Sequence, residues 1–193
     1  MKKISLLRLV FVMLCVACGA AALLAWVYLV TKEPIQQAQN AKELQAIAEV
    51  TEGAFDNDPF AEKAYISTPD NKQQLVLYPA RKDGNINAVA IKATSNHGFG
   101  GQMDLIVGFF LDGSISGFKV INSNETPGLG SKVNEKRFQD QFFGVMPQKD
   151  VFKVRQDGGE IDAVTGATIS SRAVIEAIQN AYDAYQNFSI GIK

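Results

Sequence analysis

A long apolar stretch near the N-terminus constrains this chain more than any other feature. Residues 9–30 contain no charged side chain. As a helix rising ~1.5 Å per residue, they would extend on the order of 30 Å, the thickness of a bilayer core. Lys2, Lys3 and Arg8 precede the stretch, so the positive-inside rule places the N-terminus in the cytoplasm. The sequence therefore predicts a single transmembrane anchor over residues 1–31 in the inner (cytoplasmic) membrane, with the rest of the chain on the periplasmic side.

A cleaved signal peptide is the alternative interpretation of this stretch. The apolar core of a signal peptide runs for ~7–15 residues, which is shorter than the uncharged stretch found here. The Ala20-Ala21-Ala22 segment, where a cleavage site would be sought, is followed by further apolar sequence rather than by a polar start. Both features favour the anchor.

Both cysteines of the chain, Cys15 and Cys18, lie inside the predicted anchor. A Cys-x-x-Cys pair could bind a metal or take part in redox chemistry, but on a lipid-facing helix the two side chains are more simply small apolar residues. The remainder of the chain has no cysteine. It therefore folds without a disulfide and cannot hold a thiolate-ligated iron–sulfur cluster.

Charge and composition exclude several classes of function. The formal net charge is -1, and no block of Lys and Arg forms a basic face, so we expect no nucleic-acid partner. His97 is the single histidine. The part after the anchor therefore lacks a Ser/His/Asp or Cys/His set and any cluster with metal-ligand spacing, which disfavours a hydrolase or a zinc site.

Hydrophobic periodicity predicts an α+β domain, in which an antiparallel sheet carries packed helices. A helix opened by Pro34 and an irregular stretch over residues 53–71 form a linker at residues 32–72, and the folded domain spans residues 73–193. The predicted strands are 73–78, 86–93, 103–111 and 114–121, the last two joined by the hairpin turn Asp112-Gly113, followed by 151–154 and 161–164. The predicted helices are 133–143 and 170–185.

The join between the last predicted strand and the last helix is the first candidate site. Gly166 and Ala167 allow a tight backbone turn, which places Thr168 at a helix N-terminus. Unpaired N–H groups and the helix dipole make such a terminus a binding site for phosphate. Helix capping by Thr and Ser hydroxyls explains the same residues and is, on physical grounds alone, the commoner role.

Two glycine-rich segments are further candidates. The segment Glu125-Thr126-Pro127-Gly128-Leu129-Gly130 can bring its backbone close to a flat ligand, and an ordinary turn explains it equally well. The segment His97-Gly98-Phe99-Gly100-Gly101 precedes the predicted hairpin. A lone histidine in a loop is more often a hydrogen-bonding surface residue than a catalyst.

Taken in order, these three segments resemble the FMN-binding domain family. The run Thr165-Gly166-Ala167-Thr168-Ile169-Ser170, preceded by Asp162, is similar to the family's flavinylation motif, and the other two segments match two further motifs. The resemblance covers essentially the whole chain. Within the family the chain looks like the G subunits of the Rnf ion-translocating electron transport complex. Many relatives have a histidine just before the Glu-Thr-Pro-Gly loop, whereas Asn122-Ser123-Asn124 stands here, so any role of that histidine does not carry over.

The resemblance implies a cofactor, a site and partners. FMN would be attached through its phosphate to Thr168 by a transferase of the ApbE type. The implied cofactor-binding residues are Thr168, Thr165, Gly166, Ala167, Ser170, Asp162, Glu125, Thr126, Pro127, Gly128, Leu129, His97, Gly98 and Gly100. The implied partners are the other membrane and peripheral subunits of the complex, so the chain would be part of a redox-driven ion translocase rather than a complete enzyme.

Two alternatives stay open from the sequence. The C subunit of the sodium-pumping NADH:quinone reductase shares the anchor and the flavinylated domain, although it typically has a longer soluble part. A non-redox binding or scaffold module, in which Thr168 merely caps a helix, is the alternative of a different class.

Overall fold

The computed structural model describes residues 6–53, 55–68, 73–148 and 151–190. The chain forms two compact units, residues 1–41 and residues 42–193. Lys2 and Lys3, which contribute to the predicted membrane orientation, lie outside the described residues, as do residues 69–71 of the predicted irregular stretch.

Helix α1 (Leu6–Val50) makes up the described part of the first unit and continues into the second. It is long and apolar enough to cross a membrane by length and composition, which agrees with the predicted anchor. The prediction that Pro34 opens a separate helix is wrong, because Pro34 lies inside α1. A proline inside a helix removes one backbone hydrogen bond. The residues that follow it are rich in Gln, Ala, Lys, Glu and Leu, which favour the helix strongly enough to continue it.

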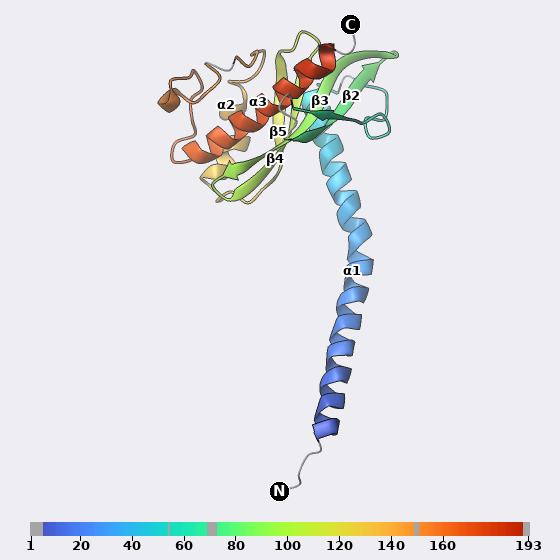
Figure 1. Cartoon of the computed structure of the whole chain (residues 1–193). Coiled ribbons are helices and arrows are strands. Elements are labelled where there is room, and N and C mark those ends of the chain that lie inside the picture. Colours follow the sequence, from blue (N-terminus) through green and yellow to red (C-terminus); the bar gives the residue numbers. More distant parts are fainter. Residues whose placement is uncertain (1–5, 54, 69–72, 149–150, 191–193) are drawn as a thin grey trace. The chain divides into compact units, whose positions relative to one another are not determined.

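The second unit is built on an antiparallel sheet with strand order β1-β2-β3-β4-β5 (Figure 1). The strands are β1 (Ala64–Ser67), β2 (Gln74–Lys82), β3 (Asn85–Gly98), β4 (Gly101–Phe110) and β5 (Ile115–Ser123). Each strand pairs with the next one along the chain, so short turns suffice to connect most of them. The predicted hairpin between β4 and β5 is confirmed, and so is the α+β class.

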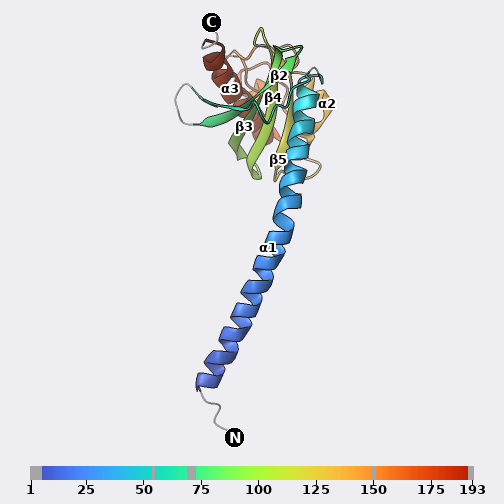
Figure 2. The ribbon, with the colours of Figure 1, turned by 90° about the vertical axis from the view of Figure 1, so that its right-hand side faces the viewer.

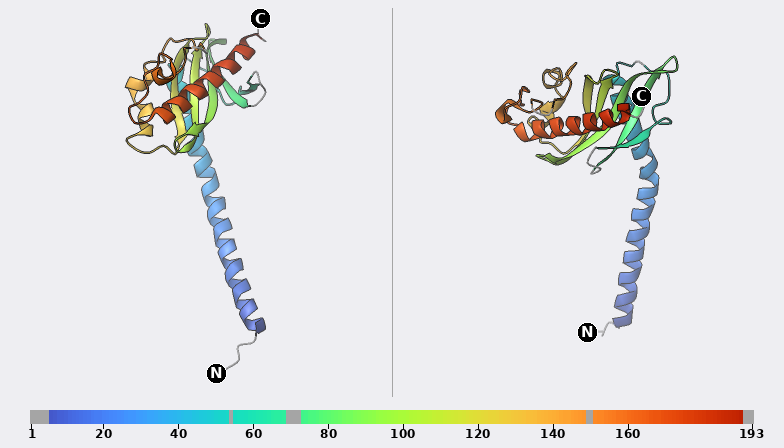
Figure 3. Two further views of the ribbon diagram at one scale, coloured as in Figure 1. Left: turned by 60° about the vertical axis from the view of Figure 1, so that its left-hand side comes forward. Right: turned by 45° about the horizontal axis from the view of Figure 1, so that its top comes forward.

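Helix α3 (Thr168–Ile190) covers one face of the sheet (Figure 3). Its apolar side packs on the inward residues of β2 to β5, and the ring of Phe109 stacks on Tyr185 with centroids 5.2 Å apart. The Tyr185 hydroxyl donates to the carbonyls of Phe110 and Leu111, which joins the helix to the β4–β5 turn. This face holds the larger core, and packing in this core fixes the position of α3 on the sheet.

Residues 42–50, the last turns of α1, cover the other face of the sheet (Figure 2). Ala46, Ile47 and Val50 are buried there against residues of β2 to β5. A Cβ atom on Gly108 would lie 2.4 Å from the Val50 carbonyl oxygen. The helix end therefore approaches the sheet only because this position of β4 has no side chain.

Charged side chains also fix residues 42–50 to the sheet. Glu43 pairs with Lys92 of β3, and the Glu49 carboxylate lies 2.7 Å from the Lys119 ammonium of β5. The hydroxyl of Ser116 donates to the carbonyl of Val50, the last residue of the helix. These contacts make the end of α1 a structural part of the second unit.

Three predictions about regular structure are wrong. The helix predicted over residues 133–143 is a 3₁₀ turn, η1 (Gly130–Asn134), followed by the short α2 (Lys136–Gln139). The i, i+4 spacing of Phe138 and Phe142 instead serves a cluster of four aromatic rings with Phe118 and Phe152.

The strands predicted over residues 151–154 and 161–164 are reduced to one isolated bridge, between Val154 and Ile161. Around it lie a 3₁₀ turn, η2 (Arg155–Asp157), and irregular chain. The alternation of apolar and polar residues in these two segments arises because their apolar side chains reach the core from loops. Strand β1 was not predicted; it is short, and although Ala64 and Ile66 pack against the core, none of its residues is fully buried.

Candidate functional site

A cavity of about 340 Å³ lies at the N-terminus of α3. Three segments that are far apart in the sequence form it: the β3–β4 turn, the loop that follows β5, and the start of α3. The lining residues are Phe99, Glu125, Thr126, Leu129, Gly130, Gly166, Ala167, Thr168, Ile169 and Ser170. We call it the Thr168 cavity. The structure thus brings together the three segments that the sequence marks as candidates.

The start of α3 places Thr168 in the wall of this cavity. Gly166 has φ 75°, a conformation that favours glycine, and turns the chain into the helix. Ser171 makes the hydrogen bonds at the helix start, since its hydroxyl accepts from the Val164 N–H (3.0 Å) and donates to the Ala167 carbonyl (3.0 Å). Thr168 is half-buried, and its hydroxyl makes no hydrogen bond with the residues that the structure describes. Capping therefore does not explain Thr168.

Glu125 connects all three segments of the cavity. The carboxylate is buried; its Oε2 accepts from the Ser170 hydroxyl (2.8 Å) and its Oε1 from the Gly100 N–H (3.2 Å). A Cβ atom on Gly130 would lie 2.1 Å from Oε2, and one on Gly98 would lie 2.7 Å from Oε1. These glycines therefore make room for the carboxylate, which is a structural reason for the glycine-rich pattern.

The remaining predicted site residues are divided between the cavity and its surroundings. Thr126 and Leu129 line the cavity, whereas Pro127 and Gly128 form an exposed turn next to it. Thr165 is exposed and is not among the lining residues. Asp162 is exposed, with its carboxylate 2.9 Å from Arg155, and also lies outside the lining.

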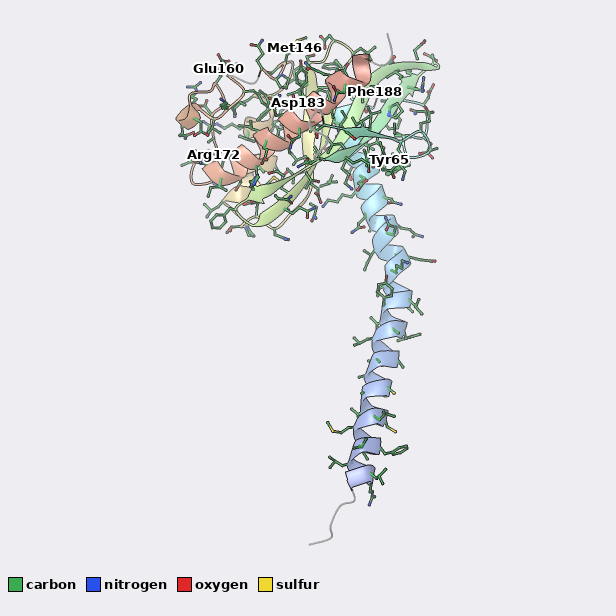
Figure 4. All side chains as sticks on the ribbon, viewed as in Figure 1. Tyr65, Met146, Glu160, Arg172, Asp183 and Phe188 are labelled. Carbon is green, nitrogen blue, oxygen red and sulfur yellow. The ribbon has the colours of Figure 1, made fainter. Side chains whose placement is uncertain are left out.

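His97 faces a different part of the molecule from the one that was predicted. Its Nδ1 lies 2.9 Å and 3.0 Å from the two carboxylate oxygens of Glu176 on α3. It lines a second cavity, of about 360 Å³, and not the Thr168 cavity. The second cavity is lined by His97, Phe152, Lys153, Val154, Asp157, Arg172, Ile175, Glu176, Gln179 and Asn180; Figure 4 labels Arg172 near the N-terminal end of α3.

Three lining residues of the Thr168 cavity were not in the predicted set: Phe99, Gly130 and Ile169. Phe99, Leu129 and Ile169 are large apolar side chains that are 69%, 48% and 46% exposed. Phe99 stands between Gly98 and Gly100 in a segment already marked as a candidate. An aromatic residue between two glycines could have indicated its role, because nothing next to it covers the ring.

The start of α3 favours an anion at one end of the Thr168 cavity, and the exposed apolar side chains favour an apolar ring, whereas the one charged side chain in the lining is the carboxylate of Glu125. The lining holds no Lys or Arg, so a phosphate would depend on the N–H groups and the dipole of α3. The described residues contain no group of three or more His, Cys, Asp or Glu that could hold a metal ion. The cavity is therefore suited to a phosphate-bearing organic ligand with an apolar or aromatic part.

Fold and cavity together define a class: an α+β domain with an N-terminal apolar helix and a ligand cavity at the start of its last helix. Residues 98–183 match the model of the FMN-binding domain, and residues 1–50 match that of the RnfG N-terminal region. The crystal structure of Shewanella oneidensis NqrC has the same fold, with a TM-score of 0.52 and 22% identity over 70% of this chain and 74% of that chain.

Curated relatives give the family. The G subunit of the ion-translocating oxidoreductase complex of Vibrio cholerae is 34% identical over 86% of this chain and 84% of its own length. The protein of the same name from Methanosarcina acetivorans is 34% identical over 91% of this chain and 92% of its own length. The chain therefore belongs to the family of the ion-translocating oxidoreductase complex G subunits, which confirms the predicted resemblance.

Proposed function

We propose that this chain is the FMN-carrying electron-transfer subunit of an ion-translocating oxidoreductase complex of the Rnf type. The matches to the FMN-binding domain and to the G subunits support this function. The single observation that carries the site is the free hydroxyl of Thr168 in the wall of a cavity at a helix N-terminus. FMN supplies the electron-transfer chemistry, and the protein supplies position and electrostatics.

The proposed attachment is a phosphoester between FMN and Thr168. The threonine oxygen bonds to phosphorus and displaces the leaving group of an activated flavin nucleotide, while the hydroxyl proton is released. The net change is the gain of one FMN less one water. An ApbE-type transferase is the proposed catalyst, because nothing in the lining of the cavity is a nucleophile-activating base other than Glu125, whose two oxygens already accept hydrogen bonds.

The residues of the cavity fit this cofactor. The ester leaves a negative charge on the phosphate, and the N-terminus of α3 stabilises it. The exposed apolar side chains of Phe99, Leu129 and Ile169 offer contact to the flat ring. Glycine backbone at positions 130 and 166 lets the loops approach closely.

The proposed location is the inner membrane, with α1 as the anchor, the N-terminus in the cytoplasm and the FMN domain in the periplasm. Length and hydropathy of α1 and the basic residues before it support this orientation. Covalent attachment suits such a location, since a flavin held by a covalent bond is not lost by dissociation outside the cytoplasm. The proposed partners are the other subunits of the complex.

The test is the intact mass of the chain purified from a host with the transferase, beside Thr168→Ala and Thr168→Ser. We expect the wild type to carry the mass of one FMN less one water and to fluoresce on a denaturing gel. Thr168→Ala should lose both properties while it keeps its fold, and Thr168→Ser should retain them because the reacting oxygen is preserved. Covalent flavin on the Thr168→Ala chain would reject the assignment.

A further inference from the structure

The tip of the β3–β4 hairpin carries Phe99 into the Thr168 cavity, but the tip has little rigidity of its own. Glycines stand on both sides of Phe99, and the pairing of β3 with β4 shifts register between Ser95 and Gly98. Glycine leaves the backbone many conformations, and a bulge interrupts the ladder of hydrogen bonds. The position of the ring must therefore be set by contacts from outside the hairpin.

One of these contacts is Glu125, described above, which accepts from the N–H of Gly100. Another is the backbone of Asn124, whose carbonyl oxygen would lie 2.0 Å from a Cβ atom on Gly100. A third is Glu176 of α3. Its carboxylate accepts from the hydroxyl of Ser95 (2.7 Å), and the same hydroxyl accepts from the N–H of His97 (3.1 Å). Because the Nδ1 of His97 also lies within 3.0 Å of Glu176, the carboxylate contacts the bulge at two residues, Ser95 and His97.

Burial makes the Ser95 contact the stronger of the two. Ser95 is 1% exposed, so losing Glu176 would leave the buried hydroxyl with a proton that has no acceptor, although the His97 N–H still donates to its oxygen. The side chain of His97 is 78% exposed, and its pairing with Glu176 is weakened by solvent. The backbone of the bulge is thus fixed mainly through Ser95, with His97 adding to it at the surface.

Helix α3 carries both Thr168 and Glu176. The two are eight residues apart, which in a helix is about 12 Å along the axis. Thr168 is the proposed attachment point of the flavin, and Glu176 fixes the hairpin that bears Phe99. A single rigid element therefore sets both positions.

We propose that Glu176, acting through Ser95 and His97, is a positioning group that holds Phe99 against the isoalloxazine ring of the flavin attached to Thr168. This role rests on the proposed function for the ring itself, whereas the fixing of the hairpin does not depend on a flavin. His97 then belongs to the support of the hairpin and not to the cofactor contacts.

The test uses the full chain in detergent, with Glu176→Ala, Glu176→Gln and, as matched control, Asp157→Asn. Asp157 pairs with Arg172 of α3, and none of its hydrogen bonds or ion pairs among the described residues involves residues 95–101. Without flavin, hydrogen exchange at residues 95–101 should rise roughly tenfold in Glu176→Ala, since charged hydrogen bonds are lost. It should rise less in Glu176→Gln, which keeps an acceptor for Ser95, and stay at the wild-type rate in the control.

With covalent flavin present, the ring should become more accessible when the hairpin loosens. We expect quenching of flavin fluorescence by iodide to increase about twofold in Glu176→Ala, with Glu176→Gln in between and Asp157→Asn at the wild-type value. Faster exchange without any change in quenching would overturn the proposal and leave Glu176 a purely structural residue. Unchanged exchange would overturn it outright. A wild-type chain that never acquires flavin would instead refute the proposed function, while the exchange experiment still decides whether Glu176 fixes the hairpin.

Discussion

The two cavities along α3 differ in how their polar groups are satisfied. In the Thr168 cavity the single charged side chain, Glu125, is buried and holds two donors, while the half-buried hydroxyl of Thr168 is left without a hydrogen bond among the described residues. In the second cavity, Asp157 holds Arg172 through two hydrogen bonds of 2.7 Å, and Glu176 holds His97.

This difference separates a cavity with a free hydroxyl at a helix N-terminus from one in which Asp157 and Arg172, and Glu176 and His97, are paired with each other, although the buried Oε1 of Gln179 there has no hydrogen-bond partner among the described residues. A hydroxyl without a partner at a helix N-terminus is available to a phosphate, whereas mutually paired charges have less to gain from a ligand. The two cavities have similar volumes, about 340 and 360 Å³, so size does not tell them apart. The pairing of Asp157 with Arg172 and of Glu176 with His97 does.

The largest expected effect comes from filling the space around Glu125. In Gly130→Ala the new Cβ would lie 2.1 Å from the carboxylate, which overpacks the site and separates Glu125 from Ser170. We expect a loss of about 1–3 kcal/mol in the free energy of unfolding, together with a large drop in flavin per protein, measured by urea titration and absorbance.

Gly144→Ala is the matched control for this change. Gly144 has φ 73° but open space around it, so alanine there brings only the cost of the left-handed conformation, about 1–2 kcal/mol, with no effect on flavin content. Equal flavin loss in both variants would mean that destabilisation, and not the geometry around Glu125, explains the result.

A smaller effect is expected from Glu125→Gln, which keeps the size of the side chain and removes its charge. One of the two hydrogen bonds, to Ser170 or to Gly100, should weaken, at a cost of about 0.5–1.5 kcal/mol. Loss of a nearby negative charge should also raise the midpoint potential of the flavin, because the reduced, more negative ring is then less disfavoured. Spectroelectrochemical titration measures this shift. A lower stability with an unchanged potential would make Glu125 a loop-holding residue alone.

The smallest expected effect is a change in the pKa of Asp157, a residue of the second cavity, and it is measured by titration. The hydrogen bonds from Arg172 lower the pKa of Asp157 below its usual value near 3.8. A carboxylate whose pKa is lowered by folding adds stability above its unfolded pKa and loses this contribution only as the pH falls through the lower, folded value. NMR titration of Asp157 should show this lowered pKa, and Arg172→Ala should return it toward 3.8 without changing the flavin content. A loss of flavin in Arg172→Ala would mean that the paired charges of the second cavity also affect flavin binding, which would contradict the distinction between the two cavities.

Much of the fold could be predicted because its pattern is local. The Asp112-Gly113 turn between alternating segments predicts the β4–β5 hairpin, and the apolar face of α3 follows from helical spacing. Pro34 and the aromatic pair Phe138 and Phe142 misled for a common reason. In both places the structure is decided by the neighbouring residues and not by the residues on which the prediction was based.

The site was predicted as segments but not as contacts. Thr168, Glu125 and Gly166 come from motifs and line one cavity, whereas Gly98, Gly100 and Gly128 do not line it. The outward position of His97 could not be predicted, because it depends on a bulge between Ser95 and Gly98 and on a carboxylate 79 residues away. Phe99 stands among glycines that carry the motif; its place between two glycines is a signal in the sequence, and the cavity shows that its ring belongs to the site.

The packing of residues 42–50 on the sheet determines where the domain can be cut. Ile47, which is fully buried, and Val50 cover the smaller core, on the face of the sheet opposite α3. A soluble fragment that begins at residue 51 would therefore expose the apolar surface of Tyr78, Ala90 and Ile106 to water. Such a fragment is expected to aggregate. Proteolysis within residues 32–41 would instead release a domain with its core intact. Any soluble form prepared for spectroscopy should therefore keep the chain from Lys42 onward.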